Sequence, residues 1–278
     1  MCGAMRFARS ASSAAVFAVL AWLPSGCASA PRDPVPDHDR IELVSRHLGE
    51  TRTMHVYVPP GYDEGLARYP VLYMPDGGLQ EDFPHLANTV DELIRAGAIA
   101  PCLLVGIENT ERRRDLTGPT EVAGDLAVAP RVGGSAAFRA FVRDELIPAI
   151  EARYRCTARR AIVGESLAGL FVVETLLLQP DLFERYVAIS PSLWWNRRDL
   201  VQRAPQLLAA FPPGSRTLWL TNADETDIAP HCAELAAILR RAAPKDLTWT
   251  YAPRRDLKHH TIFRATKAAA LRSALWQP

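Results

Sequence analysis

Ser166 stands between a short apolar stretch and a long apolar run. Residues 161–163 are Ala-Ile-Val, residues 164–169 are Gly-Glu-Ser-Leu-Ala-Gly, and residues 170–178 are mostly apolar. A strand that turns sharply into a helix at a serine is the nucleophile elbow of serine hydrolases, because the turn projects the hydroxyl and needs small neighbours. Ala168 replaces the usual last glycine of this motif. We therefore predict that Ser166 is a nucleophile, and a serine that merely caps a helix is the alternative.

A serine hydroxyl is a poor nucleophile near neutral pH and needs a base, and a histidine can take the proton and return it. His260 precedes the last predicted helix, residues 263–275, and we predict it as this base. His259 is the alternative, because adjacent side chains point in different directions.

An acidic side chain would orient the imidazole and stabilise its cation. Asp224 follows the predicted strand 218–221 most closely, and we predict it as the acid, with Glu225 and Asp227 as alternatives. The resulting order along the chain is serine, acid, histidine. This is the order found in α/β-hydrolases.

Two backbone N–H groups are predicted to stabilise an oxyanion. One belongs to Leu167, at the start of the helix that follows Ser166. The other belongs to Gly78, since a strand over residues 69–74 ends in Gly77 and Gly78, where no Cβ blocks a ligand. An ordinary glycine turn is the alternative for this pair.

Trp194 and Trp195 follow the predicted strand 186–189, and adjacent bulky side chains at a strand end favour a pocket wall. A long polar segment, residues 108–131, follows the predicted strand 101–107 and contains three consecutive arginines at 112–114. Such a loop is often a binding loop, and arginines suit an anionic or polyhydroxyl substrate. A solvated charged surface is the alternative.

Predicted strands and helices alternate along the chain, which indicates a mostly parallel sheet with helices on both faces, an α/β class. Helices are predicted at 86–96, 135–154, 170–178, 231–242 and 263–275, and strands at 52–58, 69–74, 101–107, 161–163, 186–189, 218–221 and 247–251. The carboxyl ends of parallel strands are where ligands gather in such sheets. We expect one catalytic domain over residues 41–278.

Residues 1–26 have the order of an export signal: arginines at 6 and 9, an uncharged run over 10–23, and small residues beyond. Residues 23–27, Leu-Pro-Ser-Gly-Cys, resemble a bacterial lipoprotein processing site. We therefore expect lipidation of Cys27, a tether over 27–40, and an exported protein that is periplasmic or anchored in a bacterial envelope. Ordinary cleavage after Ala30 is the alternative.

Without residues 1–26 the chain has 30 basic residues (32 less two) and 31 acidic ones, a net charge near −1. This balance disfavours nucleic acid or an anionic membrane surface as a partner and leaves Cys27 as the membrane contact. Three further cysteines, at 102, 156 and 232, have no metal-site spacing, although one disulfide among them stays open. His231, Cys232, His259 and His260 also lack a compact ligand motif, so we expect no metal and no cofactor.

Three segments and one histidine resemble the esterase family that includes esterase D-like enzymes and the enterochelin and salmochelin esterases. They are residues 69–77, 164–171 and 190–196, together with His260, and the resemblance covers nearly all of 41–275. It implies a serine and histidine pair at Ser166 and His260, with a variable acid. It also implies that Arg114, in the loop 108–117, faces an anionic catecholate.

These observations predict an α/β-hydrolase that cleaves a small-molecule ester, for example a siderophore trilactone or another acyl ester. Ser166, His260 and Asp224 would perform the chemistry, and Trp194, Trp195 and Arg114 would shape the substrate pocket. A ligand-binding lipoprotein that kept the fold without the activity is the alternative.

Overall fold

The computed structural model describes Met1 and residues 33–278, of which Asp33–Pro278 form one compact unit. The predicted export signal and Cys27 lie outside the described residues. Residues 33–38 contact the rest of this unit, since Asp33 pairs with Arg264 and the Pro34 carbonyl accepts a hydrogen bond from Asn88 at 2.8 Å.

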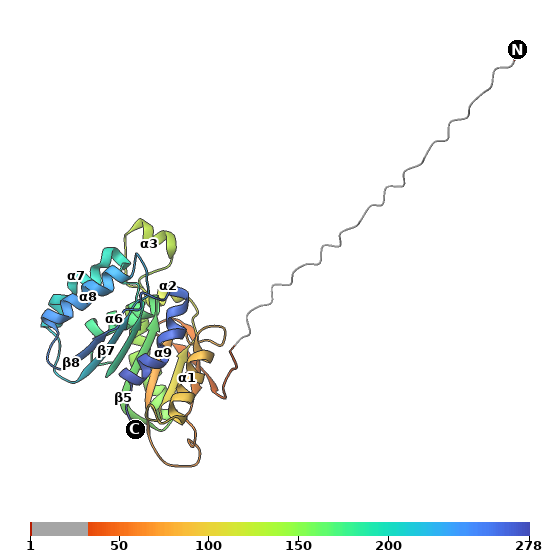
Figure 1. Ribbon diagram of the computed structural model, residues 1–278. Coiled ribbons are helices and arrows are strands. Elements are labelled where there is room, and N and C mark those ends of the chain that lie inside the picture. Colours follow the sequence, from red (N-terminus) through yellow and green to blue (C-terminus); the bar gives the residue numbers. More distant parts are fainter. Residues whose placement is uncertain (2–32) are drawn as a thin grey trace. The chain divides into compact units, whose positions relative to one another are not determined.

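An eight-stranded sheet forms the centre of the unit (Figure 1). Its strands are β1 (Asp39–Ser45), β2 (Glu50–Tyr57), β3 (Tyr69–Pro75), β4 (Leu103–Ile107), β5 (Cys156–Glu165), β6 (Arg185–Ile189), β7 (Arg216–Thr221) and β8 (Leu247–Tyr251), in the spatial order β1-β2-β4-β3-β5-β6-β7-β8. Strands β1 and β2 are antiparallel to their neighbours, and β4, β3, β5, β6, β7 and β8 run parallel. The predicted α/β class with a mostly parallel sheet is confirmed.

Helices cover both faces of the sheet. They are α1 (Phe83–Arg95), α2 (Arg112–Leu116), α3 (Ala123–Val128), α4 (Ser135–Phe141), the π-helical turn η1 (Val142–Leu146), α5 (Ile147–Arg153), α6 (Leu167–Leu178), α7 (Trp195–Ala209), α8 (Ala229–Ala242) and α9 (His259–Ala274). Helices α1 and α9 lie side by side on one face, while α6, α7 and α8 belong to the other (Figure 1).

Successive side chains of β3 point to opposite faces of the sheet, which explains why the unit has two hydrophobic cores. Val71 and Tyr73 pack with α4 to α8, whereas Leu72 and Met74 pack with α1 and α9. Successive side chains of a strand point to opposite faces, so an almost continuous apolar strand can serve both cores. The sheet is therefore held from both sides, and the ends of its central strands are fixed in position.

Several elements differ from the sequence-based expectations. Strand β1 and helix α7 were not predicted, and the segment predicted as a loop contains the short helices α2 and α3. The predicted helix 135–154 is present but passes through the π-helical turn η1 just before Pro148, because proline cannot donate the usual backbone hydrogen bond. Helix α9 begins at His259, four residues earlier than predicted.

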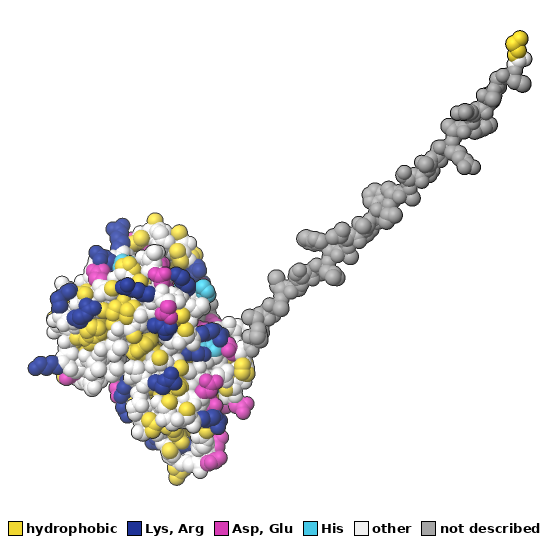
Figure 2. Space-filling view, viewed as in Figure 1, with side chains coloured by type: hydrophobic (Ala, Val, Ile, Leu, Met, Phe, Trp, Pro, Cys, Tyr) yellow, Lys and Arg dark blue, Asp and Glu magenta, His cyan; other side chains and the backbone are white. Residues whose placement is uncertain are grey.

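No helix within residues 33–278 is long and apolar enough to span a bilayer. Basic and acidic side chains are interspersed over the face of this unit seen in Figure 2.

Candidate active site

Ser166 lies at the turn between β5 and α6 with φ 60° and ψ −119°. A non-glycine residue with positive φ is strained, and such strain is typical of functional turns. The turn is tight because a Cβ at Gly164 would stand 2.6 Å from the backbone of Ala168, so only glycine fits there. The Ser166 N–H donates to the Ile189 carbonyl at 3.0 Å, which ties the turn to β6.

His259, the first residue of α9, holds the ring that contacts Ser166. Its Nε2 lies 3.1 Å from the Ser166 Oγ. The helix start is fixed by Thr261, whose Oγ1 accepts the Lys258 N–H at 3.1 Å and whose N–H donates to the Lys258 carbonyl at 2.9 Å. The prediction of His260 is wrong in this respect: consecutive helical residues project about 100° apart, and His260 is exposed.

Glu225 contacts the other side of the His259 ring. Its Oε1 is hydrogen-bonded to His259 Nδ1, and its side chain is only 7% exposed. Its second oxygen accepts the Ser190 hydroxyl at 2.8 Å and the Ala223 N–H at 3.0 Å. The three residues Ser166, His259 and Glu225 thus form a continuous series of contacts.

These contacts shift the pKa of both His259 and Glu225. The hydrogen bond that His259 donates to Glu225 raises the pKa of His259, although partial burial of the ring opposes this. Burial disfavours the ionised form of Glu225, but the hydrogen bonds from His259 and Ser190 outweigh burial and lower the pKa of this carboxyl. A carboxylate at Nδ1 leaves Nε2 free to accept a proton from Ser166.

The predicted acid Asp224 lies elsewhere. Its carboxylate contacts Lys258 Nζ at 2.6 Å and is 60% exposed, and this contact lowers its pKa. The prediction of Asp224 is therefore wrong, because its side chain turns to solvent while that of Glu225 turns toward β6. Asp227 lines the same cavity but makes no hydrogen bond to either histidine among the described residues.

The two predicted oxyanion donors differ in placement. Leu167 is the first residue of α6, so its N–H has no partner within the helix. The Gly78 N–H instead donates to Glu81 Oε2 at 2.7 Å, and Gly78 lines a different cavity from Ser166. The structure thus contradicts Gly78 as a free donor. The glycine pair is explained by close packing, since a Cβ at Gly77 would stand 2.3 Å from the Gly106 Cα.

An open cavity of about 680 Å³ contains Ser166. It is lined by Ser166, Ser192, Trp194, Asp224, Glu225, Thr226, Asp227, Ile228, Lys258, His259 and His260. Trp194 thus lies in the predicted pocket. Trp195 does not: its ring is 5% exposed and its N–H donates to the Gly118 carbonyl at 2.9 Å, so this second tryptophan serves the core.

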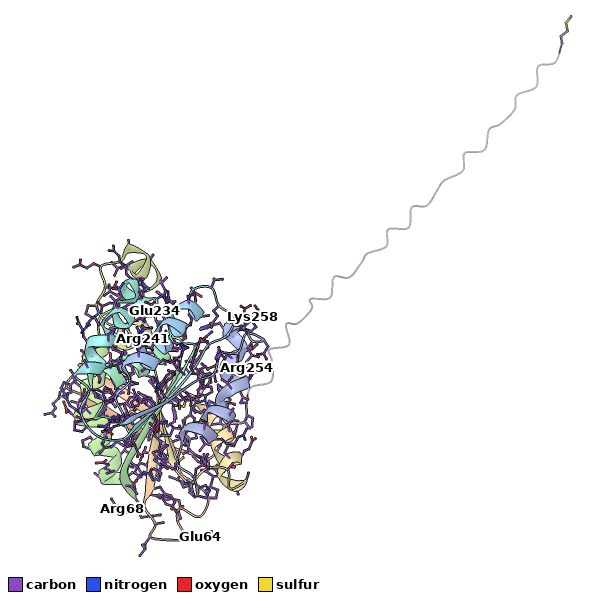
Figure 3. The ribbon with its side chains drawn as sticks, turned by 60° about the vertical axis from the view of Figure 1, so that its left-hand side comes forward. Glu64, Arg68, Glu234, Arg241, Arg254 and Lys258 are labelled. Carbon is purple, nitrogen blue, oxygen red and sulfur yellow. The ribbon has the colours of Figure 1, made fainter. Side chains whose placement is uncertain are left out.

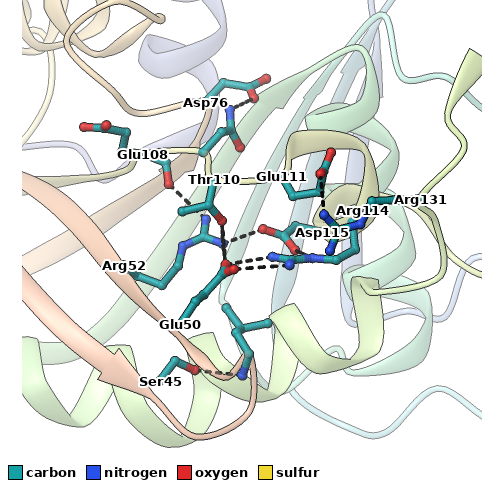
Figure 4. Close-up of polar contacts among 12 residues, drawn as sticks. Ser45, Glu50, Arg52, Asp76, Glu108, Thr110, Glu111, Arg114, Asp115 and Arg131 are labelled. Atoms are coloured by element: carbon teal, nitrogen blue, oxygen red, sulfur yellow. Dashed lines mark hydrogen bonds and ion pairs between the residues drawn. The ribbon is translucent and has the colours of Figure 1, made fainter.

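The arginine predicted to bind substrate is engaged in a buried ion-pair cluster (Figure 4). Arg114 contacts Glu50 at 2.7 Å and Asp115 at 2.7 Å, and Asp115 also pairs with Arg52. Arg52 and Asp115 have no exposed side-chain surface. The prediction that Arg114 faces a ligand is therefore contradicted, because its charge is used to hold α2 against β2.

Arg112 is the arginine of this loop whose charge acts on Glu165, the residue before Ser166. It binds the Asp76 carboxylate through Nε and a terminal nitrogen, both at 2.7 Å. Burial raises the pKa of Glu165 to about 7, and the charge of Arg112 opposes this shift. The sequence offered three arginines and no signal to separate them, because their directions depend on the unpredicted helix α2.

Residues 33–278 contain no group of three or more His, Cys, Asp or Glu side chains placed to hold a metal ion. Cys102, Cys156 and Cys232 are buried and free. Burial raises the pKa of each thiol, which makes these cysteines unreactive core residues.

Comparisons with known proteins show the family to which the chain belongs and its relatives. A family model described as "Putative esterase" matches residues 45–261. The ferri-bacillibactin esterase BesA of Bacillus subtilis is 32% identical over 196 residues, which cover 63% of this chain and 65% of BesA. The siderophore triacetylfusarinine C esterase of Aspergillus fumigatus is 30% identical over 185 residues, which cover 62% of this chain and 61% of that enzyme. The chain therefore spans less than two thirds of the length of these relatives.

Among solved structures, an IroE-like serine hydrolase from Shewanella oneidensis superimposes with a TM-score of 0.77 and 26% sequence identity. The match covers 85% of this chain and 79% of that protein.

Proposed function

The chain belongs to the putative esterase family, and we propose that it is a serine hydrolase of carboxylic esters. The observation that carries the proposal is the series of contacts from Ser166 through His259 to Glu225, at the end of the sheet where ligands bind in such folds.

In the proposed reaction, the Ser166 Oγ attacks the ester carbonyl while His259 Nε2 takes its proton. Glu225 holds the ring in the tautomer with hydrogen on Nδ1 and stabilises the imidazolium that forms. The Leu167 N–H, together with the positive end of the α6 dipole, stabilises the oxyanion. His259 then gives its proton to the leaving alkoxide, and water releases the acyl group by the same steps in reverse order.

We place a siderophore ester first among candidate substrates. The names of the two relatives given above support this class, and the open cavity beside Ser166 has room for a ligand larger than a simple acyl ester. Trp194 offers an aromatic surface next to the reacting serine. A panel of ferric catecholate trilactones, ferric hydroxamate esters, feruloyl esters and acetyl esters would rank these substrates by kcat/KM.

The test of the proposed activity uses the purified full-length chain and a short-chain p-nitrophenyl ester, beside Ser166→Ala and Ser192→Ala. Ser192 is a matched control, because its hydroxyl lies 3.4 Å from that of Ser166 but is not at the elbow. Loss of hydrolysis and of fluorophosphonate labelling in Ser166→Ala alone supports the proposal. No hydrolysis and no labelling in the parent chain would leave a ligand-binding protein as the better account.

We also propose that the protein is exported and lipidated at Cys27. The support is the order of residues in 1–30. Expression in a bacterial host with radiolabelled palmitate, beside Cys27→Ala, tests this. Label in the parent alone is the expected result, and equal label in both would contradict lipidation at Cys27.

A further inference from the structure

Glu165 is the residue before Ser166, and the proposed mechanism does not use its carboxyl group. Its side chain is 17% exposed, and its Oε1 lies 3.7 Å from His259 Nε2. No residue among those described donates a hydrogen bond to this carboxyl, whereas Glu225 accepts three. Glu165 thus faces the nitrogen that exchanges a proton with Ser166.

The charges around Glu165 come from four other elements. Arg112 in α2 and Asp76 at the end of β3 already neutralise each other through two hydrogen bonds. Asp82, before α1, adds a negative charge, and His259 in α9 is the remaining partner. Because Arg112 is committed to Asp76, the imidazole of His259 is the cation that a Glu165 carboxylate can approach.

Burial raises the pKa of Glu165 to about 7, and Asp82 and Asp76 act in the same direction while His259 and Arg112 oppose them. The pKa of His259 is raised mainly by its hydrogen bond to Glu225, and the charges of Glu165 and Asp227 act in the same direction. Each of the two groups is therefore among the charges that shift the pKa of the other.

We propose that Glu165 is a second positioning residue, which stabilises protonated His259 from the Nε2 side while Glu225 does so from the Nδ1 side. This role rests on the proposed serine mechanism. When the Ser166 proton moves to Nε2, the ring becomes a cation between two carboxylates. Glu165 forms no bond to the reacting atoms and acts only through His259.

The sign of the effect follows from the charges. An ionised Glu165 favours protonated His259, so removal of the carboxylate lowers the pKa of His259. Neutral His259 is the form that accepts the serine proton, so the acid limb of the kcat/KM profile moves to lower pH in Glu165→Gln. Above that limb kcat falls, because the imidazolium formed during the reaction loses one stabilising charge.

The test titrates His259 by NMR in the full-length chain with labelled histidine, assigned with His259→Gln, and needs no substrate. Glu165→Gln is compared with Glu165→Asp, which keeps a carboxylate, and with Glu64→Gln. Glu64 is an exposed glutamate at the opposite end of the sheet from Lys258, the neighbour of His259 (Figure 3).

We expect the pKa of His259 to fall by about 0.5 or more in Glu165→Gln, roughly a threefold loss of proton affinity. We expect no change in Glu64→Gln and a partial return toward the parent value in Glu165→Asp. A pKa of His259 that is the same in Glu165→Gln and the parent would overturn the proposal.

The pH profile of ester hydrolysis then separates the two claims. An acid limb that moves in Glu165→Gln with the NMR pKa supports the role in catalysis. An active parent with an unmoved limb refutes only the role of Glu165. A parent without hydrolysis that depends on Ser166 refutes the serine mechanism and the catalytic role of Glu165 together, whereas the NMR titration still decides whether the two groups are coupled.

Discussion

Glu225→Gln is the substitution whose effect the geometry specifies most closely. The carboxylate accepts three hydrogen bonds, one from His259 on Oε1 and two on Oε2, from the Ser190 hydroxyl and the Ala223 N–H. A glutamine has one oxygen and one NH2 group in these places. The Ala223 N–H can only donate, so the glutamine oxygen must face it, and the NH2 group must then face His259 Nδ1.

That orientation reverses the tautomer of the ring. Nδ1 must accept a hydrogen bond from the glutamine, so the proton moves to Nε2, and Nε2 can no longer accept a proton from Ser166. The stabilising charge beside the imidazolium is lost as well. A reversal of this kind costs about 10³–10⁴ in kcat, or about 4–5.5 kcal/mol of transition-state stabilisation.

The assay is steady-state hydrolysis of a short-chain p-nitrophenyl ester, with circular dichroism to check folding. The matched control is Asp224→Asn, which removes a neighbouring carboxylate that is exposed and paired with Lys258. We expect the control to keep kcat within about threefold, because screening by water weakens an exposed charge. A Glu225→Gln variant that folds and keeps kcat within about tenfold of the parent would refute the assignment of the acid.

Three further predictions concern pH, stability and the two tryptophans. Because the pKa of His259 is raised, activity should fall with decreasing pH around a midpoint above 6.5, and an activity midpoint below 6.5 would contradict this prediction. The stability that protonation of His259 contributes should be present below pH 6.5 and lost as pH rises through the raised pKa. Asp115→Asn should lower the free energy of unfolding by about 3–5 kcal/mol, because it removes the buried carboxylate that pairs with Arg52 and Arg114 and leaves buried Arg52, among the described residues, only its ion pair with Glu50 at 3.1 Å. Asp256→Asn, in an exposed pair, should leave stability nearly unchanged. Equal losses in chemical unfolding would refute the buried-pair argument. Trp194→Ala should raise KM for aromatic esters roughly tenfold with little loss of stability, while Trp195→Ala should cost about 3–5 kcal/mol of stability; the opposite pattern would exchange their roles.

The family and the fold could be predicted from sequence because their signals are local. The elbow at Ser166 needs a strand, a tight turn and a helix within a few residues, and a Cβ at Gly164 would collide with Ala168. The alternation of apolar strands and amphipathic helices likewise depends on short stretches of sequence. The predicted fold class is confirmed by the sheet order, and the predicted family is confirmed by the family match.

The partners of Ser166 depended on features that sequence does not specify locally. His259 and His260 differ by one step of a helix, so the choice between them rests on the residue at which α9 begins. What distinguishes Glu225 from Asp224 as the candidate acid is its contacts with Ser190 and Ala223, and Ser190 lies 35 residues away in the chain. His259 and Glu225, the residues that the structure places in contact with each other, were both among the alternatives, because the sequence pattern limited the candidates to a few neighbouring residues.

The arginine loop failed as a prediction for another reason. Three consecutive arginines indicate charge but not direction, and their directions are set by α2 and by a buried cluster that includes Glu50 and Asp115. Asp115 lies within the same loop, and Glu50 is the first residue of β2. A solvated or substrate-binding surface was expected, whereas Arg114 holds the loop to the sheet.

The most direct measurement of the central claim compares His259→Ala with His260→Ala in the hydrolysis of one p-nitrophenyl ester. If His259 is the base for Ser166, its loss should lower kcat/KM by about 10²–10⁴, while loss of the exposed neighbour should leave the rate within about threefold. A larger loss in His260→Ala than in His259→Ala would contradict the proposed site.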